Sequence, residues 1–314
     1  MSLGPTASIA RLRHRAKRAA RLFFEAHSYE EVDTPSLVFC PGLDAHVHSL
    51  GAIEVHGEPR HLITSPEFHM KRLLADGAER IYQFARCFRA EELGTWHQPE
   101  FLMLEWYRVG SSFSELLRET EELVRTIGCE LAPDGILRRG DRELVVDIRA
   151  PFIQLEVAEA FRQYAHVEDV VRLAQDEPEE YFQLFVDRVE PALASFGQGV
   201  LLTHYPISQA GLARALPHAP DFSERFELYV AGVELCNGFG ELTDPVEQRS
   251  RFERERARRF RAGEPLYPID EDFLGALSRG LPASVGNALG FDRLVALCVG
   301  GHGLQASLPF PFRG

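Results

Sequence analysis

The chain has 314 residues, 45% of them hydrophobic, which is enough to bury one large core or two small ones. Its 34 lysines and arginines stand against 47 aspartates and glutamates, giving a formal net charge of -13. That sign disfavours a protein whose main partner is a nucleic-acid backbone, although it leaves room for a local basic patch. No apolar run approaches the ~20 residues that span a bilayer, so we expect no membrane helix.

The cysteines form no C-x-x-C pair and no dense framework, which is typical of reduced thiols in a cytoplasmic protein. They stand at positions 40, 87, 129, 236 and 298. The basic N-terminal region also lacks the apolar segment of a signal peptide. Because no linker or low-complexity stretch divides the chain, we expect a single domain over residues 1–314, with a helical insertion at about 151–198.

The first predicted element is a helix over about residues 6–27. Its basic residues between Arg11 and Arg21 would form one face beside small apolar residues. A solvated helix is the favoured interpretation, and a docking face for an acidic protein is the alternative. Short strands and turns follow over 44–72, and Pro66 suits the first turn of a helix that begins there.

A hairpin is predicted next, because side chains alternate from Ile81 onward and again after a loop of Gly, His, Gln and Pro. One face would carry Gln83, Ala85, Cys87, Arg89 and Glu91 from the first strand, and Phe101, Met103, Glu105 and Tyr107 from the second. Arginine, glutamate, aromatic rings and tyrosine on one face can hold a flat base and a phosphate. The alternative is an edge hairpin whose charges are solvated.

Later patterns complete the expected fold. They predict a helix from Ser112 to about Cys129, helices over 151–198, a strand over 200–205, a hairpin over 225–235 that turns at Ala231-Gly232, and a solvated helix over 247–261. Because the strands come from separated parts of the chain, they indicate an antiparallel sheet flanked by helices, an α+β fold.

The second hairpin predicts a cation site. If Ala231-Gly232 forms its turn, Tyr229 faces Glu234, and Glu227 is the diagonal neighbour of Glu234 on the same face. Diagonal Cβ atoms lie ~7 Å apart, so the two carboxylates can share a divalent cation. Oxygen ligands without a His/Cys cluster favour Mg²⁺ beside substrate phosphates. A surface hairpin with scattered acids is the alternative.

An anion site is indicated at Arg293, which follows Asp292 at the predicted start of a helix over 294–299. A cation at a helix N-terminus opposes the macrodipole, so the arginine makes sense there if an anion binds beside it.

Three ordered motifs in this sequence resemble those of the class II aminoacyl-tRNA synthetases: motif 1 at 25–35, motif 2 at 86–107 and motif 3 at 286–297. Within class II, the segments 65–72 and 232–245 are most similar to the lysyl branch. The sequences of 80–83 and 99–108 resemble one family in particular, the short lysyl-synthetase paralogues called EpmA, PoxA or GenX. The similarity covers nearly the whole chain.

This resemblance implies a class II catalytic domain that forms a homodimer through its first segment. Motif 1 begins by about residue 22, so we expect no anticodon-binding domain, and tRNA is an unlikely partner. The family activates (R)-β-lysine or lysine with ATP and Mg²⁺ and joins it to a lysine of elongation factor P. A free-standing lysyl-tRNA synthetase and an inactive regulatory paralogue are the alternatives.

The resemblance also assigns residues. Arg89 and Arg293 are the expected catalytic pair, because in-line transfer of AMP to a carboxylate needs positioning and charge stabilisation rather than a nucleophile. The expected ATP set is Arg89, Glu91, His97, Gln98, Phe101, Glu234, Leu235, Gly290 and Arg293. The expected amino-acid set is Ser65, Pro66, Glu67, Tyr107, Asn237, Phe239, Glu241 and Ala288. The expected metal ligands are Glu227 and Glu234.

Ala288 stands where lysyl-tRNA synthetases usually have glycine and the paralogue family has alanine. Its methyl group would shrink the pocket near the substrate amino group and favour a β-amino acid. Other positions that differ from the usual residues of the family are Gln98, Leu102, Cys236 and the pair Ser284-Val285. None of them removes a charge that adenylation needs.

Overall fold

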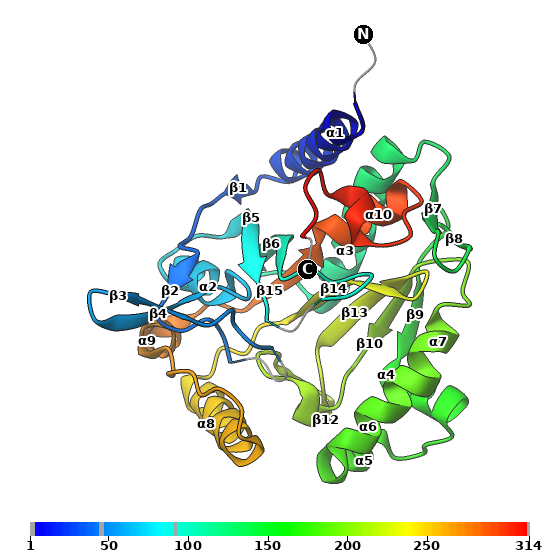
Figure 1. The fold of residues 1–314 in the computed structure, drawn as a ribbon. Coiled ribbons are helices and arrows are strands. Elements are labelled where there is room, and N and C mark those ends of the chain that lie inside the picture. Colours follow the sequence, from blue (N-terminus) through cyan, green and yellow to red (C-terminus); the bar gives the residue numbers. More distant parts are fainter. Residues whose placement is uncertain (1–3, 44–46, 91–92, 313–314) are drawn as a thin grey trace.

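The computed structural model describes residues 4–43, 47–90 and 93–312. Glu91, one of the expected ATP ligands, lies outside the described residues. An eight-stranded sheet forms the centre, in the order β1-β5-β6-β15-β14-β13-β10-β9 (Figure 1). Its edge pairs, β1 with β5 and β9 with β10, are parallel, and every pair between them is antiparallel. The predicted α+β fold, an antiparallel sheet flanked by helices, is confirmed.

The strands of this sheet are β1 (Glu30–Glu31), β5 (Arg80–Phe88), β6 (Glu100–Val109), β9 (Ile153–Glu156), β10 (Val200–Thr203), β13 (Arg225–Val230), β14 (Val233–Gly240) and β15 (Ser284–Gly290). Smaller sheets contain β2 (Leu37–Val38), β3 (Ala52–Val55), β4 (Glu58–Leu62), β7 (Ile136–Arg139), β8 (Leu144–Asp147), β11 (Ala215–Leu216) and β12 (Ala219–Ser223). Short 3₁₀ helices span Ile207–Gln209 and Leu304–Ser307.

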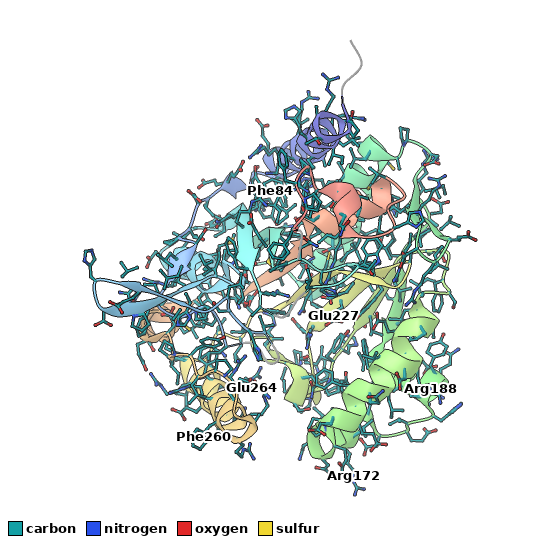
Figure 2. The ribbon with its side chains drawn as sticks, viewed as in Figure 1. Phe84, Arg172, Arg188, Glu227, Phe260 and Glu264 are labelled. Atoms are coloured by element: carbon teal, nitrogen blue, oxygen red, sulfur yellow. The ribbon has the colours of Figure 1, made fainter. Side chains whose placement is uncertain are left out.

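The main core lies on the sheet face covered by α1 (Pro5–Ala26), α3 (Phe113–Leu131) and α10 (Phe291–Cys298) (Figure 1). A capping box starts α3, because Ser112 Oγ accepts from the Glu115 amide and the Glu115 carboxylate accepts from the Ser112 amide. Trp106 and Phe24 are fully buried there, and each such ring contributes about 1.5–3 kcal/mol relative to exposure. Phe84 lies under α1, with Lys17 over its ring (Figure 2).

Helices cover the two ends of the opposite face of the sheet, and a small apolar cluster around Ile63 packs on β5 and β6. At one end, α2 (Glu67–Ala75), α8 (Pro245–Ala262) and α9 (Glu271–Gly280) pack on Ile81 and Tyr107. At the other end lie α4 (Val157–Ala160), α5 (Val170–Asp176), α6 (Pro178–Leu184) and α7 (Glu190–Leu193), with π-helical turns at Phe161–Ala165 and Phe185–Val189 (Figure 1). The middle of this face remains for a site.

Three predicted elements differ in detail. The region 151–198 begins with β9 rather than a helix, because Ile153 and Leu155 pair with β10 and extend the sheet. The helix expected to be solvated, α8, buries Arg259 completely, with the guanidinium 5.2 Å from the Tyr267 ring centroid. Pro66 stands at the N-cap of α2 rather than inside its first turn.

The predicted turn at Ala231-Gly232 is confirmed, with φ of 51° and 68° at the two residues. Tyr229 pairs with Glu234 as expected. The next pair joins Leu228 to Cys236, so a β-bulge leaves Leu235 without a partner of its own.

Candidate active site

Strand register gathers the expected site residues on the open face of the sheet. Because side chains alternate between faces, the paired positions identify which residues share that face. From β6 to β13 they are Phe101, Met103, Glu105 and Tyr107; Gly286, Ala288 and Gly290; Glu234, Asn237 and Phe239; and Arg225, Glu227 and Tyr229. The face predicted for the first hairpin is confirmed, since Ala85 pairs with Met103 and Cys87 with Phe101.

Arg293 and Glu234 meet at one end of this face. Arg293 Nη1 donates to the Glu234 carbonyl at 2.9 Å and lies 3.8 Å from its carboxylate, and Nε donates to the Trp96 carbonyl at 3.2 Å. Gly290 lies next to Arg293, since a Cβ added at Gly290 would stand 3.3 Å from Arg293 Cδ. Leu235 points its side chain into the core, so only its backbone carbonyl borders this space. A cation with little bulk around it suits a phosphate chain.

Arg89 extends the positive charge toward β6. Its guanidinium carbon lies 5.1 Å from the Phe101 ring centroid, a cation-π distance. His97 is exposed on the loop between β5 and β6, where its backbone bridges to Gly94. Gln98 is buried instead, and its Oε1 accepts from the Phe312 amide at 2.9 Å. The structure therefore directs this oxygen toward the C-terminal segment rather than the open face.

Glu227 lies near the middle of the sheet (Figure 2) and is held by three donors. Tyr205 and Tyr229 hydroxyls donate to Oε2, each at 2.6 Å, and Arg225 donates to Oε1 at 2.6 Å. A carboxylate oxygen has two acceptor positions, so Oε2 is saturated and Oε1 keeps one position. Glu234 shares this face, and its side chain is 42% exposed to the opening.

Glu227 and Glu234 share this face and are the carboxylates that could hold a divalent cation. Loss of solvation, followed by the charge of Glu227, raises the pKa of Glu234 above its usual value. A bound cation would offset that repulsion. Within residues 4–43, 47–90 and 93–312, no three His, Cys, Asp or Glu side chains cluster as a complete metal site. Oxygens of the substrate would therefore have to complete the coordination, as is usual for Mg²⁺.

An acidic pocket occupies the other end of the face, under α2. Glu67 and Glu241 are both buried, and Lys71 lies between them with its ammonium 2.5 Å from Glu67 and in contact with Glu241. The same ammonium lies 5.0 Å from the Phe239 ring centroid and 5.9 Å from that of Tyr107. Burial lowers the pKa of Lys71, but Glu241 and Glu67 outweigh burial and raise it overall.

Glu105 belongs to this pocket, although the sequence analysis gave it no role in the site. Its Oε1 accepts from the Tyr107 hydroxyl at 2.6 Å and its Oε2 from the Ser65 hydroxyl at 2.8 Å. Ser65 Oγ in turn accepts from the Glu67 amide at 3.1 Å. Burial, followed by the charge of Glu67, raises the pKa of Glu105 to about 8. Strand alternation had placed this carboxylate on the correct face.

Small residues form the floor between the two ends. Gly286 faces Tyr107, and a Cβ there would lie 2.3 Å from the tyrosine ring and 2.5 Å from Glu241 Oε1. Ala288 is half-buried and pairs with Asn237 on one side and Glu105 on the other. Asn237 Oδ1 accepts from Arg225 at 3.3 Å, which joins the floor to the Glu227 cluster. The face thus combines a half that could bind phosphate, around Arg89 and Arg293, with a half that could bind an ammonium group, under α2.

The family comparison agrees with this geometry. Residues 5–313 match the family model described as tRNA synthetases class II (D, K and N). The chain belongs to this family of class II synthetases.

The chain is also similar to individual relatives whose names are more specific than the family description. The chain is 41% identical to a protein of Vibrio vulnificus, over 98% of this chain and 97% of the relative. It is also 41% identical to a protein of Erwinia tasmaniensis, over 98% and 96%, and 39% identical to one of Vibrio cholerae, over 98% and 97%. All three relatives are named elongation factor P–(R)-beta-lysine ligase. They confirm the resemblance to the short lysyl-synthetase paralogues.

The remaining sequence expectations concern the cell compartment. All five cysteines are free thiols, in agreement with the expected reduced state. Of the helices in the described part of the chain, none combines the length and apolar character that crossing a bilayer requires.

Proposed function

We propose that the protein activates (R)-β-lysine, or lysine, with ATP and transfers it to a lysine of elongation factor P. The ammonium-binding half of the site carries this proposal. The carboxylates of Glu67, Glu105 and Glu241 are buried there, and Lys71 pairs with Glu67 and Glu241 beside the Tyr107 and Phe239 rings. Such a pocket suits a substrate with more than one ammonium group.

Adenylation would proceed by positioning and electrostatics. The substrate carboxylate would attack the α-phosphorus in line, with Arg89 placed to hold both groups and Arg293 to hold the departing pyrophosphate. Mg²⁺, bound to Glu227 and Glu234, would neutralise part of the phosphate charge. His97, Phe101, Gly290 and the Leu235 backbone border the nucleotide side, and we assign the remaining ATP contacts, including Gln98 and Glu91, from the resemblance alone.

No covalent enzyme intermediate is needed. Cys87 and Cys236 belong to the site strands β5 and β14, and both are buried. Burial raises the pKa of each thiol above its usual value. Thiols of this kind are poor nucleophiles at neutral pH, so the adenylate would pass its aminoacyl group directly to the acceptor amine.

The amino acid would lie across the small-residue floor. Glu241 and Tyr107 would receive the distal ammonium, Glu67 and Ser65 the other amino group, and Phe239 the aliphatic stem. Pro66, buried at the N-cap of α2, fixes the start of the helix that carries Glu67. Asn237 lies toward the phosphate half, where the substrate carboxylate must meet ATP.

The acceptor is tested by supplying purified protein with ATP, Mg²⁺ and β-lysine, together with either elongation factor P or tRNA-Lys. We expect intact-mass spectrometry to show one added aminoacyl group on one lysine of elongation factor P, and little or no charging of tRNA. The net charge of -13 gives little phosphate-neutralising surface for tight tRNA binding. Preferential labelling of tRNA would instead favour a lysyl-tRNA synthetase.

We expect the active form to be a homodimer.

Ala288→Gly is expected to raise activation of α-lysine relative to β-lysine by ~10-fold or more, because one methyl group is worth ~1–3 kcal/mol of discrimination. The methyl stands on the floor between Asn237 and Glu105. The measurement is the ratio of kcat/KM values for the two amino acids in pyrophosphate exchange. Ala283→Gly, at an exposed position nearby, is the matched control. An unchanged ratio in Ala288→Gly would remove this residue as the discriminator.

A further inference from the structure

Lys71 occupies the place that the sequence motifs reserve for the substrate ammonium. It is 1% exposed, and its ammonium contacts Glu67 and Glu241 beside the Tyr107 and Phe239 rings. The pairing with Glu67 is local, since the two residues stand one turn apart on α2. The pairing with Glu241 joins α2 to the end of β14. A cation with no exit to solvent is therefore built into the pocket.

Glu241 has a second oxygen that this cation does not use. The residue is 0% exposed, and among the described residues Oε1 has no hydrogen-bond donor. Lys71 contacts Oε2 instead. Gly286 lets Oε1 and the Tyr107 ring approach the strand closely, since a Cβ there would lie 2.5 Å from this oxygen and 2.3 Å from the ring. A buried carboxylate oxygen without a donor costs free energy unless a ligand supplies one.

We infer that Lys71 is a specificity-determining residue: as the counter-ion of Glu67 and Glu241 it favours their charged forms, so that Glu241 Oε1 can receive the substrate ammonium. The inference rests on the proposed function for the identity of the substrate. Lys71 does not touch the reacting atoms. It acts through the two carboxylates, by fixing their position and their charge.

The charged groups around the pocket explain why a counter-ion is needed. Glu67 and Lys71 come from α2, Glu105 and Tyr107 from β6, and Glu241 from the end of β14, while Cys87 of β5 faces Glu105. Burial raises the pKa of Glu105 and of Glu241 to about 8, and the charge of Lys71 opposes this rise. Without Lys71, we expect these pKa values to rise further, so that the carboxylates carry less charge for the substrate.

Lys71→Gln tests the role of the charge, because glutamine keeps hydrogen-bond donors but has no charge. We expect the KM for the lysine-type substrate in pyrophosphate exchange to rise at least ~10-fold at pH 7, with kcat within about threefold. The KM of both proteins should fall with rising pH as the carboxylates ionise, because burial raises the pKa of Glu105 and Glu241 to about 8 even beside Lys71. The fall should lie at higher pH in the variant than in the wild type. Equal pH profiles would overturn the inference.

Arg72→Gln is the matched control. Arg72 is the next residue on α2, but its side chain is 33% exposed and lies 3.4 Å from Asp272 at the surface. We expect its substrate KM and pH profile to equal those of the wild type. A KM increase equal to that of Lys71→Gln would show that loss of any cation on α2 suffices, which contradicts a role inside the pocket.

Thermal unfolding provides a second readout that does not depend on the substrate. Burial already raises the pKa of Glu241 above its usual value, and Lys71 opposes that rise. Without Lys71 the folded-state pKa should rise further, so the variant should lose more stability than the wild type as pH rises. We expect its Tm deficit relative to the wild type to be larger at about pH 8 than at about pH 5. An equal deficit at both pH values would overturn the inference. If wild-type protein activates no lysine-type substrate, the proposed function fails, and this readout still decides the role of Lys71.

Discussion

Replacing Arg293 by alanine is expected to lower ATP–pyrophosphate exchange by ~10² or more, which corresponds to ~3 kcal/mol of transition-state stabilisation. The guanidinium is held by backbone carbonyls of Glu234 and Trp96 rather than by a full ion pair, since the Glu234 carboxylate is 3.8 Å away. Its charge therefore remains to be used by an anion. If Mg²⁺ binds the Glu234 carboxylate, that carboxylate would neutralise less of the Arg293 charge.

The fold should not depend on Arg293, and this separates catalysis from stability. Arg279→Ala on α9 is the control, because that side chain is 59% exposed and pairs only with Asp76 at the surface. We expect both variants to keep a Tm near that of the wild type and only Arg293→Ala to lose exchange. Exchange within threefold of wild type in Arg293→Ala would refute its role at the phosphates.

Arg89→Ala is expected to have an effect of similar size, ~10² or more in kcat/KM for both ATP and the amino acid. Arg89 follows the end of β5 and lies over Phe101, and we propose that it reaches the point where the substrate carboxylate meets ATP. A single cation in that position can contact the carboxylate and the α-phosphate at once. Loss of positioning at the reacting centre should therefore reduce kcat as well as raise KM.

Arg86→Ala on the same strand is the matched control for Arg89→Ala. Its side chain lies on the other face of β5, is 52% exposed and pairs with Glu100 at 3.3 Å. Exposed ion pairs of this kind contribute ~0–1 kcal/mol, so we expect near-normal exchange. Comparable losses in the two variants would indicate damage to the hairpin rather than removal of a catalytic group.

The parts of the fold that sequence predicted well are those governed by local patterns. Side-chain alternation gave the correct faces of β5 and β6, and the Ala231-Gly232 dipeptide gave the correct turn and the pairing of Tyr229 with Glu234. These features depend on neighbours in the chain. The same is true of the capping box at Ser112, which begins α3 where a helix was expected.

Features that depend on distant partners could not be predicted in the same way. The sequence places Glu67 and Lys71 one turn apart, but it does not indicate that Glu241, at the end of β14, also contacts Lys71. Arg259 lies in a run of mixed charges, which normally indicates a solvated helix, and is buried because Tyr267 and the Val47 carbonyl receive it.

For the candidate site, the resemblance supplied the residue list and the structure supplied the relations within it. Gln98 is an example, because only the three-dimensional arrangement reveals its bond to the Phe312 amide. Glu105 is the converse case. Its place on the correct face was predictable, but its partners Ser65 and Tyr107 give it a role in the pocket that the pattern alone could not assign.

The bulge at Leu235 determines which side chains of strand β14 lie on the same face of the sheet. Glu234 and Asn237 are three positions apart, and in a regular strand an odd interval sends two side chains to opposite faces. The unpaired residue restores agreement, so the carboxylate proposed for the metal and the residues that line the amino-acid side share one surface. One amino acid therefore acts as a spacer between two halves of the chemistry. If β14 were a regular strand that still contained Leu235, Glu234 and Asn237 would lie on opposite sides of the sheet.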